Sequence, residues 1–174
     1  MKTIVSSLAC LTIALLAVPA IVRAETSAVR VRTEQVNKTD EKAFAKSQSR
    51  SLKVYVSNAS KEMMDLKVKY FFFGRDVKTH EFVTVDQGEK PIQVKPLATE
   101  MVETSTAKTN FVENHLEGKG ASAKKVEASG SKFVGHAVQV LQADKVVAES
   151  CEPASMKEQI GKAGAAPKPE AVKK

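Results

Sequence analysis

The chain has 174 residues, of which 27% are charged and 5% are aromatic, and its formal net charge is +7. That length suits one domain with its tails. The basic residues are spread along the chain with acids between them, whereas a nucleic-acid-binding protein needs a basic stripe with base-stacking aromatics. The composition therefore argues against nucleic acid and supports only weak attraction to anionic polymers of the cell envelope.

The first 24 residues have the pattern of a secretory signal peptide. Lys2 gives a charged start, residues 4–18 are almost wholly apolar, and Val22-Arg23-Ala24 offers small residues at the two positions that a signal peptidase reads. We expect cleavage between Ala24 and Glu25, with a cut after Ala20 as the alternative. The sequence thus predicts an exported protein, periplasmic or extracellular.

Two other fates of this leader are disfavoured. Its apolar run is shorter than the roughly 20 residues that a spanning helix needs, which disfavours an uncleaved membrane anchor. No other segment is long and apolar enough to cross a membrane, so no transmembrane segment is expected after signal cleavage. Ser7-Leu8-Ala9 before Cys10 has serine where a lipoprotein has a large aliphatic residue. Cleavage would also remove Lys2 and Arg23, which lowers the formal charge from +7 to +5.

Cysteine content limits how the mature chain can be stabilised. Only Cys151 remains after cleavage, so no intramolecular disulfide can form. A lone thiol in an exported protein is available for an intermolecular disulfide. The alternative is a small, half-buried residue near a strand end. In both cases the stability must come from a hydrophobic core.

Period-two alternation recurs along the chain, while helical periodicity is nearly absent. Residues 28–33 alternate as a strand and residues 37–50 are polar, so residues 25–49 are interpreted as an N-terminal strand and polar linker. From residue 50 onward the alternation predicts a β-sandwich domain, residues 50–152. Its expected strands are 52–57, 64–73, 80–85, 92–94, 100–106, 133–141 and 146–150.

Prolines and low-complexity segments mark the rest of the chain. Pro91 and Pro96 bound the strand at 92–94 and place it at a sheet edge, because proline removes a ladder donor. Residues 114–131 are rich in Gly, Ala, Ser and Lys and predict a mobile loop, with a short helix at 109–116 before it. Residues 153–174 read as a disordered Ala/Pro/Lys tail.

About seven short strands joined by tight turns predict an all-β fold, an antiparallel β-sandwich of the immunoglobulin or fibronectin-III-like kind. The stretch LKVYVSNAS at 52–60, continuing to LKVKY at 66–70, resembles bacterial extracytoplasmic sandwich domains of the FxLYD type. In those domains an alternating strand also ends in an Asn-containing turn. The resemblance implies a sandwich fold and an exported setting, and it carries over no functional residue.

Four consecutive aromatics, Tyr70-Phe71-Phe72-Phe73, are the sharpest local feature. Only one face of a sandwich strand looks into the core, so Tyr70 and Phe72 are expected inside and Phe71 and Phe73 outside. Tyr55 faces outward on the preceding strand. Tyr55, Phe71 and Phe73 therefore predict an aromatic platform for sugar rings or a protein partner. In the alternative, the N-terminal segment, the 107–131 loop or an extra strand covers these rings.

Catalytic and metal-binding patterns are weak. The chain has no Gly-x-Ser-x-Gly, and no phosphate-binding glycine loop opens a helix. None of the histidines has metal-ligand spacing to another histidine or cysteine. His136 alternates with apolar neighbours and is expected to be a hydrogen-bonded, partly buried residue. His115 with Glu113 and Glu117 is the one cluster to examine; no catalytic residue, metal or cofactor is predicted.

The sequence therefore predicts an exported, non-enzymatic β-sandwich that binds or scaffolds an envelope protein or glycan. One alternative is a carbohydrate-binding module that uses the same aromatic face. Another is a hydrolase with a cryptic carboxylate or His115 site. A third is an inhibitor that presents the 107–131 loop to an external hydrolase. Neither the ligand nor the oligomeric state follows from the sequence.

Overall fold

The computed structural model describes residues 28–118 and 123–162. Over these ranges the chain forms ten strands, one 3₁₀ turn and one short α-helix. None of the helices found in this part of the chain is long and apolar enough to cross a membrane. The predicted signal peptide, residues 1–24, lies outside the described residues.

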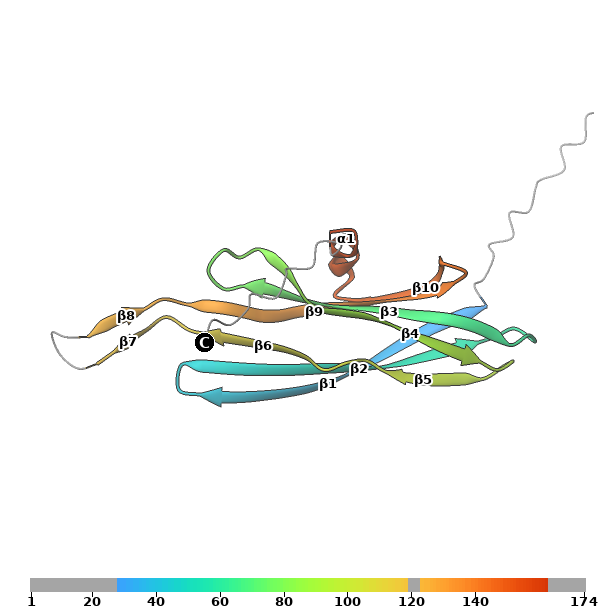
Figure 1. Ribbon diagram of the computed structural model, residues 1–174, viewed down its shortest axis with the longest axis horizontal. Helices are drawn as coiled ribbons and strands as arrows, with labels where there is room; N and C mark the ends of the chain where they lie inside the picture. Colours follow the sequence, from blue (N-terminus) through green and yellow to red (C-terminus); the bar gives the residue numbers. More distant parts are fainter. Residues whose placement is uncertain (1–27, 119–122, 163–174) are drawn as a thin grey trace, which may run out of the picture.

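The strands are arranged in two layers (Figure 1). The first layer is built on β2 (Ala45–Asn58), which pairs along its whole length with β1 (Val29–Lys42). Its other edge is shared by β5 (Thr99–Glu103) and β6 (Ala107–Val112), which follow one another along it. All these pairings are antiparallel.

The second layer contains four antiparallel strands, and their order is β4-β3-β9-β10. Their bounds are Phe82–Val94 for β4, Met64–Asp76 for β3, Ser129–Gln142 for β9 and Lys145–Glu152 for β10. With β5 and β6 counted as one interrupted strand, the two layers hold seven strands. The prediction of an all-β antiparallel sandwich is confirmed.

Alternate side chains of the facing strands fill the space between the layers. Tyr70 and Phe72 of β3 point into this core, as their spacing predicts. Each fully buried aliphatic or aromatic side chain stabilises the fold by about 1.5–3 kcal/mol. The side chains with no exposed surface include Leu52, Val54, Val56, Val68, Phe72, Val138 and Val140.

The prediction of a polar linker before residue 50 is wrong. β1 and β2 form one continuous hairpin whose turn is Ala43-Phe44, between the paired residues Lys42 and Ala45. Every residue of Val36–Lys42 is exposed, so this half of β1 has no buried face and its sequence shows no alternation of apolar and polar residues. Pairing with β2 holds it in the strand conformation.

The two strands expected at 80–85 and 92–94 are a single strand, β4. Gly88, expected in a turn between them, lies instead under the ring of Tyr70. A Cβ atom at residue 88 would lie 2.6 Å from Tyr70 Cζ, so the glycine provides space for a core side chain. The expected edge position is confirmed, because β4 ends the order of the second layer.

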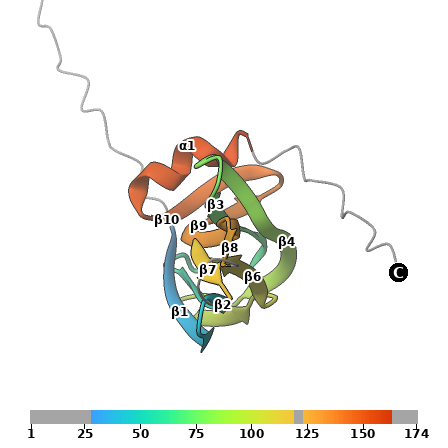
Figure 2. The ribbon, with the colours of Figure 1, turned by 90° about the vertical axis from the view of Figure 1, so that its left-hand side faces the viewer.

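Strands replace the helix and much of the loop expected between 107 and 131. β6 occupies the place of the predicted helix at 109–116. Beyond it β7 (His115–Glu117) pairs with β8 (Lys124–Val126) in a hairpin that projects from one end of the sandwich (Figures 1 and 2). Residues 119–122 between these strands lie outside the described residues.

The expected disordered tail is also wrong in its first part. After β10 the chain forms a 3₁₀ turn, Ala154–Met156, and α1, Lys157–Ile160. We call residues 154–160 the C-terminal cap, because they lie over the outer side of the second layer (Figure 2). Met156 is 3% exposed, and the spacing of Met156 and Ile160 directs both toward the sheet. Residues 163–174 of the expected tail lie outside the described residues.

Candidate functional site

The aromatic platform expected on the outer surface is not formed. Phe71 and Phe73 do share the outer face of β3, with ring centroids 6.2 Å apart and an interplanar angle of 5°. They are only 3% and 1% exposed, because Met156 and Ile160 of the C-terminal cap pack against them. The cover is thus a segment other than the three that the sequence suggested.

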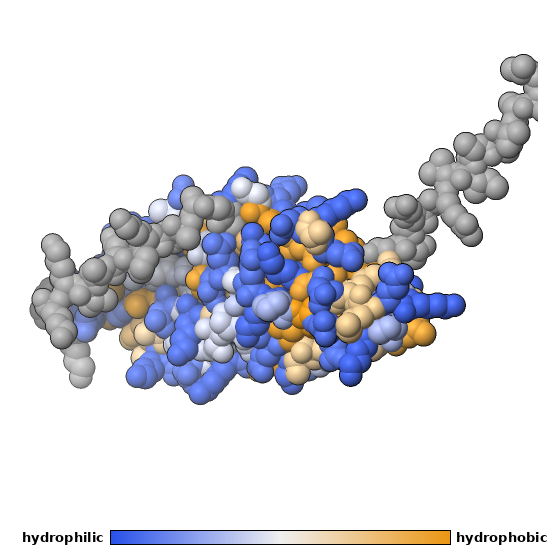
Figure 3. Space-filling view, turned by 45° about the vertical axis from the view of Figure 1, so that its right-hand side comes forward, coloured by the Kyte–Doolittle hydropathy of each residue, from blue (hydrophilic) through white to orange (hydrophobic). Residues whose placement is uncertain are grey.

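Tyr55 lies on the opposite side of the molecule from these two rings. It belongs to β2 in the first layer, whereas Phe71 and Phe73 belong to the second. The guanidinium of Arg32 lies 4.7 Å from the centroid of the Tyr55 ring, and the Tyr55 hydroxyl donates to Glu34 over 3.0 Å. On the face shown in Figure 3, hydrophobic residues lie in patches among hydrophilic ones.

Cys151 is a half-buried residue of β10, beside the cluster under the C-terminal cap. Burial, and then the Glu149 carboxylate 3.7 Å away, raise the pKa of its thiol to about 11. Disulfide formation requires the thiolate, so this environment disfavours the intermolecular disulfide considered for Cys151. The alternative position, a half-buried residue near a strand end, is confirmed.

His136 is buried between the two layers, with 1% of its surface exposed. Its Nε2 atom lies 3.3 Å from Thr33 Oγ1 of β1 and 4.0 Å from Glu152 Oε2 of β10. Burial lowers the pKa of the imidazole, Glu152 raises it, and Arg50 of β2 lowers it further; burial is the largest of the three effects. His136 is therefore a hydrogen-bonded core residue, as expected, but more deeply buried.

The lowered pKa of His136 makes stability depend on pH. The unfolded chain binds a proton near the usual value of 6.5, before the folded chain does. The contribution of neutral His136 to the free energy of unfolding is therefore fully present above about pH 6.5. It falls as the pH drops toward the pKa of His136 in the folded chain, by up to about 1.4 kcal/mol per pH unit. Urea unfolding of the wild type and of His136→Gln between pH 7 and 5 measures this, and the variant should lose that dependence. An equal slope in both proteins would contradict the assignment to His136.

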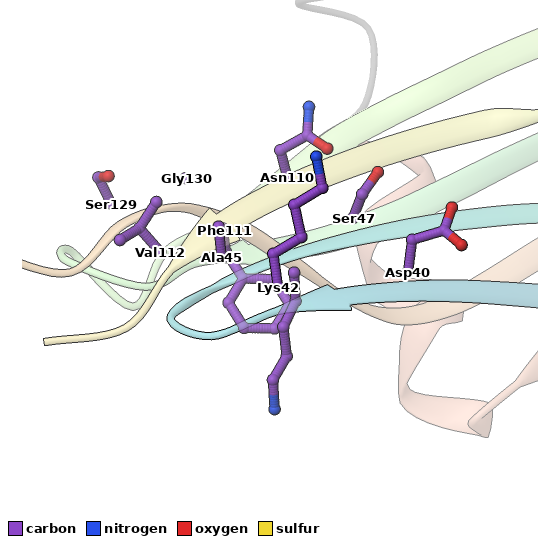
Figure 4. A pocket seen from close by; sticks show the side chains of 10 residues that line it. Asp40, Lys42, Ala45, Ser47, Asn110, Phe111, Val112, Ser129 and Gly130 are labelled. Atoms are coloured by element: carbon purple, nitrogen blue, oxygen red, sulfur yellow. The ribbon is translucent and has the colours of Figure 1, made fainter. Parts of the chain in front are cut away.

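The end of the sandwich from which the β7–β8 hairpin projects contains two hollows, and we call it the hairpin end. The smaller hollow, of about 320 Å³, lies beside the turn between β1 and β2. Figure 4 shows the Phe111 ring against this hairpin, with Asp40, Ser47 and Asn110 around it from three strands. Here the end of β6 pairs with β2 on one edge and with β9, through Phe111 and Gly130, on the other.

The larger hollow, of about 450 Å³, lies between the β3–β4 turn and the start of β9. Its volume is in the range of small-ligand sites. Apolar and polar groups from four parts of the chain line it. The apolar ones are Val77, Val112, Ala128, Phe133 and Val134, and the polar ones are Arg75, Asp76, His80, Glu113, Asn114 and Lys132.

Ion pairs and backbone hydrogen bonds hold the two acids that line the larger hollow, Glu113 and Asp76. The Glu113 carboxylate lies 3.6 Å from the ammonium groups of both Lys46 and Lys132. The Asp76 carboxylate accepts the backbone N–H groups of Lys78 and Thr79, each over 2.8 Å, and these bonds lower its pKa.

Cations and aromatic rings alternate across the same region. Arg75 of β3 is paired with Lys132 of β9 on one side and with Phe82 of β4 on the other. The Arg75 guanidinium lies 4.6 Å from the Phe82 ring centroid, and the Lys132 ammonium lies 4.4 Å from that of Phe111. Such cation–π contacts each stabilise by about 0.5–1 kcal/mol at exposed sites.

Exposed apolar side chains surround the hollows. Phe44 is 49% exposed, Leu116 67% and Phe82 39%. The Phe44 ring stacks on His115, with centroids 4.2 Å apart and an interplanar angle of 3°. Aromatic and arginine side chains at a surface are the ones enriched in protein interfaces.

The expected cluster of His115, Glu113 and Glu117 does not form a histidine–carboxylate site. His115 Nδ1 lies 2.8 Å from the backbone oxygen of Glu113, while the Glu113 carboxylate turns to the two lysines. In residues 28–118 and 123–162, no three His, Cys, Asp or Glu side chains are close enough together to hold a metal ion. Sequence reasoning found His115 and Glu113 but missed Phe44, Arg75 and Lys132, which only strand pairing brings together.

No protein-family model and no curated protein sequence matches the chain. Among solved structures, a putative β-galactosidase from Bacteroides fragilis is 14% identical with a TM-score of 0.45, over 71% of this chain and 17% of that one. A Bacteroides uniformis β-glucuronidase is 11% identical with a TM-score of 0.47, over 71% and 14%. A structure from Akkermansia muciniphila is 14% identical with a TM-score of 0.33, over 84% and 80%. The chain thus spans less than a fifth of either glycosidase, and likeness this low assigns no function.

Proposed function

We propose that this protein is an exported, non-enzymatic binding or scaffolding protein of the cell envelope that engages its partner through the hairpin end. The observation that carries the proposal is the combination found there. Exposed Phe44, Phe82 and Leu116 surround two hollows, and ion pairs already hold Lys46, Lys132 and Glu113 in their walls. A preformed surface of this kind loses little side-chain entropy on binding.

The charges favour a mixed partner surface over an anionic one. Four basic and three acidic side chains, histidine apart, line the two hollows. Such a near balance gives no strong attraction to a polyanion and suits a protein with both polar and apolar groups. Loops and hairpins at one end of a rigid sandwich are also where binding residues concentrate. Export rests on the pattern of residues 1–24.

A carbohydrate-binding module has less support. Its aromatic face required Tyr55, Phe71 and Phe73 together, and the C-terminal cap covers the two phenylalanines. An inhibitor that presents the 107–131 region would use the same end as the proposed partner site, because the β7–β8 hairpin projects from it (Figure 1). A hydrolase is the other alternative; of the acids in the larger hollow, Glu113 is ion-paired with Lys46 and Lys132, and Asp76 accepts backbone N–H groups.

A cleft-filling substitution tests the proposal. Ala128 is half-buried in the larger hollow, and Ala98 is half-buried in a hollow of about 300 Å³ at the opposite end. Species captured from envelope extract by the wild type would be purified and titrated against both tryptophan variants. Ala128→Trp should weaken binding at least about ten-fold, equivalent to about 1.4 kcal/mol, because the indole occupies the partner's place. Ala98→Trp should bind like the wild type.

Other outcomes have defined meanings. Equal binding by both variants, with both folded, would place the partner site elsewhere and overturn the proposal. A glycan as the captured species would favour the carbohydrate-binding alternative, and a hydrolase whose activity falls on binding would favour the inhibitor. Turnover of the captured species would show an enzyme.

A further inference from the structure

The second half of β1, Val36–Lys42, has one strand edge without a partner strand in the described part of the chain. Its other edge pairs with β2 throughout, and all seven of its side chains are exposed. The first half of β1 approaches the second layer, where Thr33 meets His136, so the open edge begins beyond it. Such an edge is a template for pairing with another strand.

The other edge strands of the sandwich are interrupted by a proline or a bulge, or are short, and the second half of β1 has none of these features. β4 contains Pro91, and Val85 interrupts its pairing with β3 as a bulge. β10 has a bulge at Val147, and β5 is only five residues long. Bulges, prolines and shortness all oppose strand addition. Val36–Lys42 is unbroken and contains no proline.

The direction of the free backbone groups follows from the β1–β2 turn. Lys42 and Ala45 flank a two-residue turn and form a hydrogen-bonded pair. Hydrogen-bonded and non-bonded pairs alternate along an antiparallel ladder. The N–H and C=O groups of Asn37, Thr39 and Glu41 are therefore directed away from β2, where a second strand can reach them.

We propose that two copies of this chain associate through this edge, antiparallel, with Thr39 of one copy opposite Thr39 of the other. In this arrangement Lys38 of each copy faces Asp40 of the second copy. The groups of Asn37, Thr39 and Glu41 then complete a ladder between the copies, and β2 and β1 of both copies form one continuous sheet.

The charges select this register over its neighbours. When the antiparallel pair is centred on Thr39, every residue of Val36–Lys42 faces a residue of the same segment in the second copy, and two Lys38–Asp40 pairs form. A shift that centres the ladder on Lys38 or on Asp40 sets like charges directly opposite, which is destabilising. Lys38 and Asp40 are 75% and 65% exposed, and their ammonium and carboxylate lie 4.0 Å apart within one copy. Both charges are therefore available to a second copy and alternate in sign along the edge.

Charge exchange provides the decisive test. The full chain is expressed from Met1, purified as the host cell processes it, and examined by sedimentation velocity up to millimolar concentration. Lys38→Asp sets Asp opposite Asp in its own dimer, and Asp40→Lys sets Lys opposite Lys. Each variant alone should dimerise about ten-fold more weakly than the wild type. An equimolar mixture of the two should recover the lost association, because every cross-strand pair is again of opposite charge.

A backbone variant tests the ladder independently of charge. Thr39→Pro removes an N–H that β2 does not use, so the sandwich should stay folded while the dimer is lost. Thr39→Val keeps the N–H and the strand preference and should dimerise like the wild type. A wild type that sediments as a monomer at every concentration would overturn the proposal. So would a mixture of the two charge variants that associates no better than either alone. Loss of partner capture by the Ala128→Trp variant does not bear on these results.

Discussion

Replacing Phe71 and Phe73 together by alanine is expected to destabilise the protein by about 5 kcal/mol or more, which approaches the whole stability of a small domain. Both rings are almost fully buried and stack on each other. Their removal also leaves Met156 and Ile160 of the C-terminal cap without a surface to cover. Urea unfolding followed by far-UV circular dichroism measures the loss.

Exposed rings provide the control for this double variant. Phe44 and Phe82 are 49% and 39% exposed, so Phe44→Ala and Phe82→Ala should each cost less than about 1 kcal/mol. Met156→Ala should cost less in the double-alanine background than in the wild type, because its contacts are already lost. A double variant as stable as the wild type would show that the C-terminal cap does not cover these rings in solution.

The alternation predicted correctly that Tyr55, Phe71 and Phe73 point away from the core between the layers, but not that Tyr55 and the two phenylalanines lie on opposite sides of the molecule. Period two states which face of its own strand a residue occupies. It does not state which layer the strand joins. β2 and β3 are consecutive, yet β2 pairs with β1, β5 and β6, and β3 pairs with β4 and β9. Layer membership depends on long-range pairing, which leaves no local pattern.

A bulge in β9 also causes period-two alternation to assign a residue to the wrong face of its strand. Simple alternation puts Val134, His136 and Val138 on one face. Pairing with β3 steps from Phe133 to Gly135, so Val134 is an extra residue and the parity changes there. Val134 consequently packs with the outer cluster of Phe71, while Val138 lies in the core. The burial of His136 could be predicted; its position relative to Val134 could not.

The hairpin end was the least predictable part of the molecule. Its charged and exposed residues have no apolar periodicity, so the sequence reads as linker at 37–50 and as loop at 114–131. Strand pairing creates the site: Arg75 and Lys132 are neighbours because β3 pairs with β9, and Glu113 reaches Lys46 because β6 pairs with β2. Neither contact was visible along the chain, where only Glu113 and His115 are near each other in sequence.

Gly130→Ala is expected to destabilise the protein by about 3 kcal/mol or more and to disturb the hairpin end selectively. Gly130 has φ +89°, a conformation that costs other residues about 1–3 kcal/mol. A Cβ atom there would also overlap the backbone carbonyl of Asn110. Gly130 pairs with Phe111, and its carbonyl accepts the N–H of Val77 over 2.9 Å, so the β6–β9 junction and the β3–β4 turn should loosen together.

Gly161→Ala is the control for Gly130→Ala. It adds the same methyl group at a position with room for it and with an ordinary backbone conformation. Gly161 has φ −66°, and an added Cβ atom would meet nothing within 4 Å, so Gly161→Ala should leave stability unchanged within about 0.5 kcal/mol. In Gly130→Ala, the amide of Val77 should exchange faster than the loss of global stability explains. The core amide of Val54 should change its exchange rate only by the amount that the change in global stability accounts for. Since both hollows depend on this junction, the variant should also lose the proposed partner. Uniform acceleration at both amides would mean that the junction unfolds only with the whole domain and does not form a separable site.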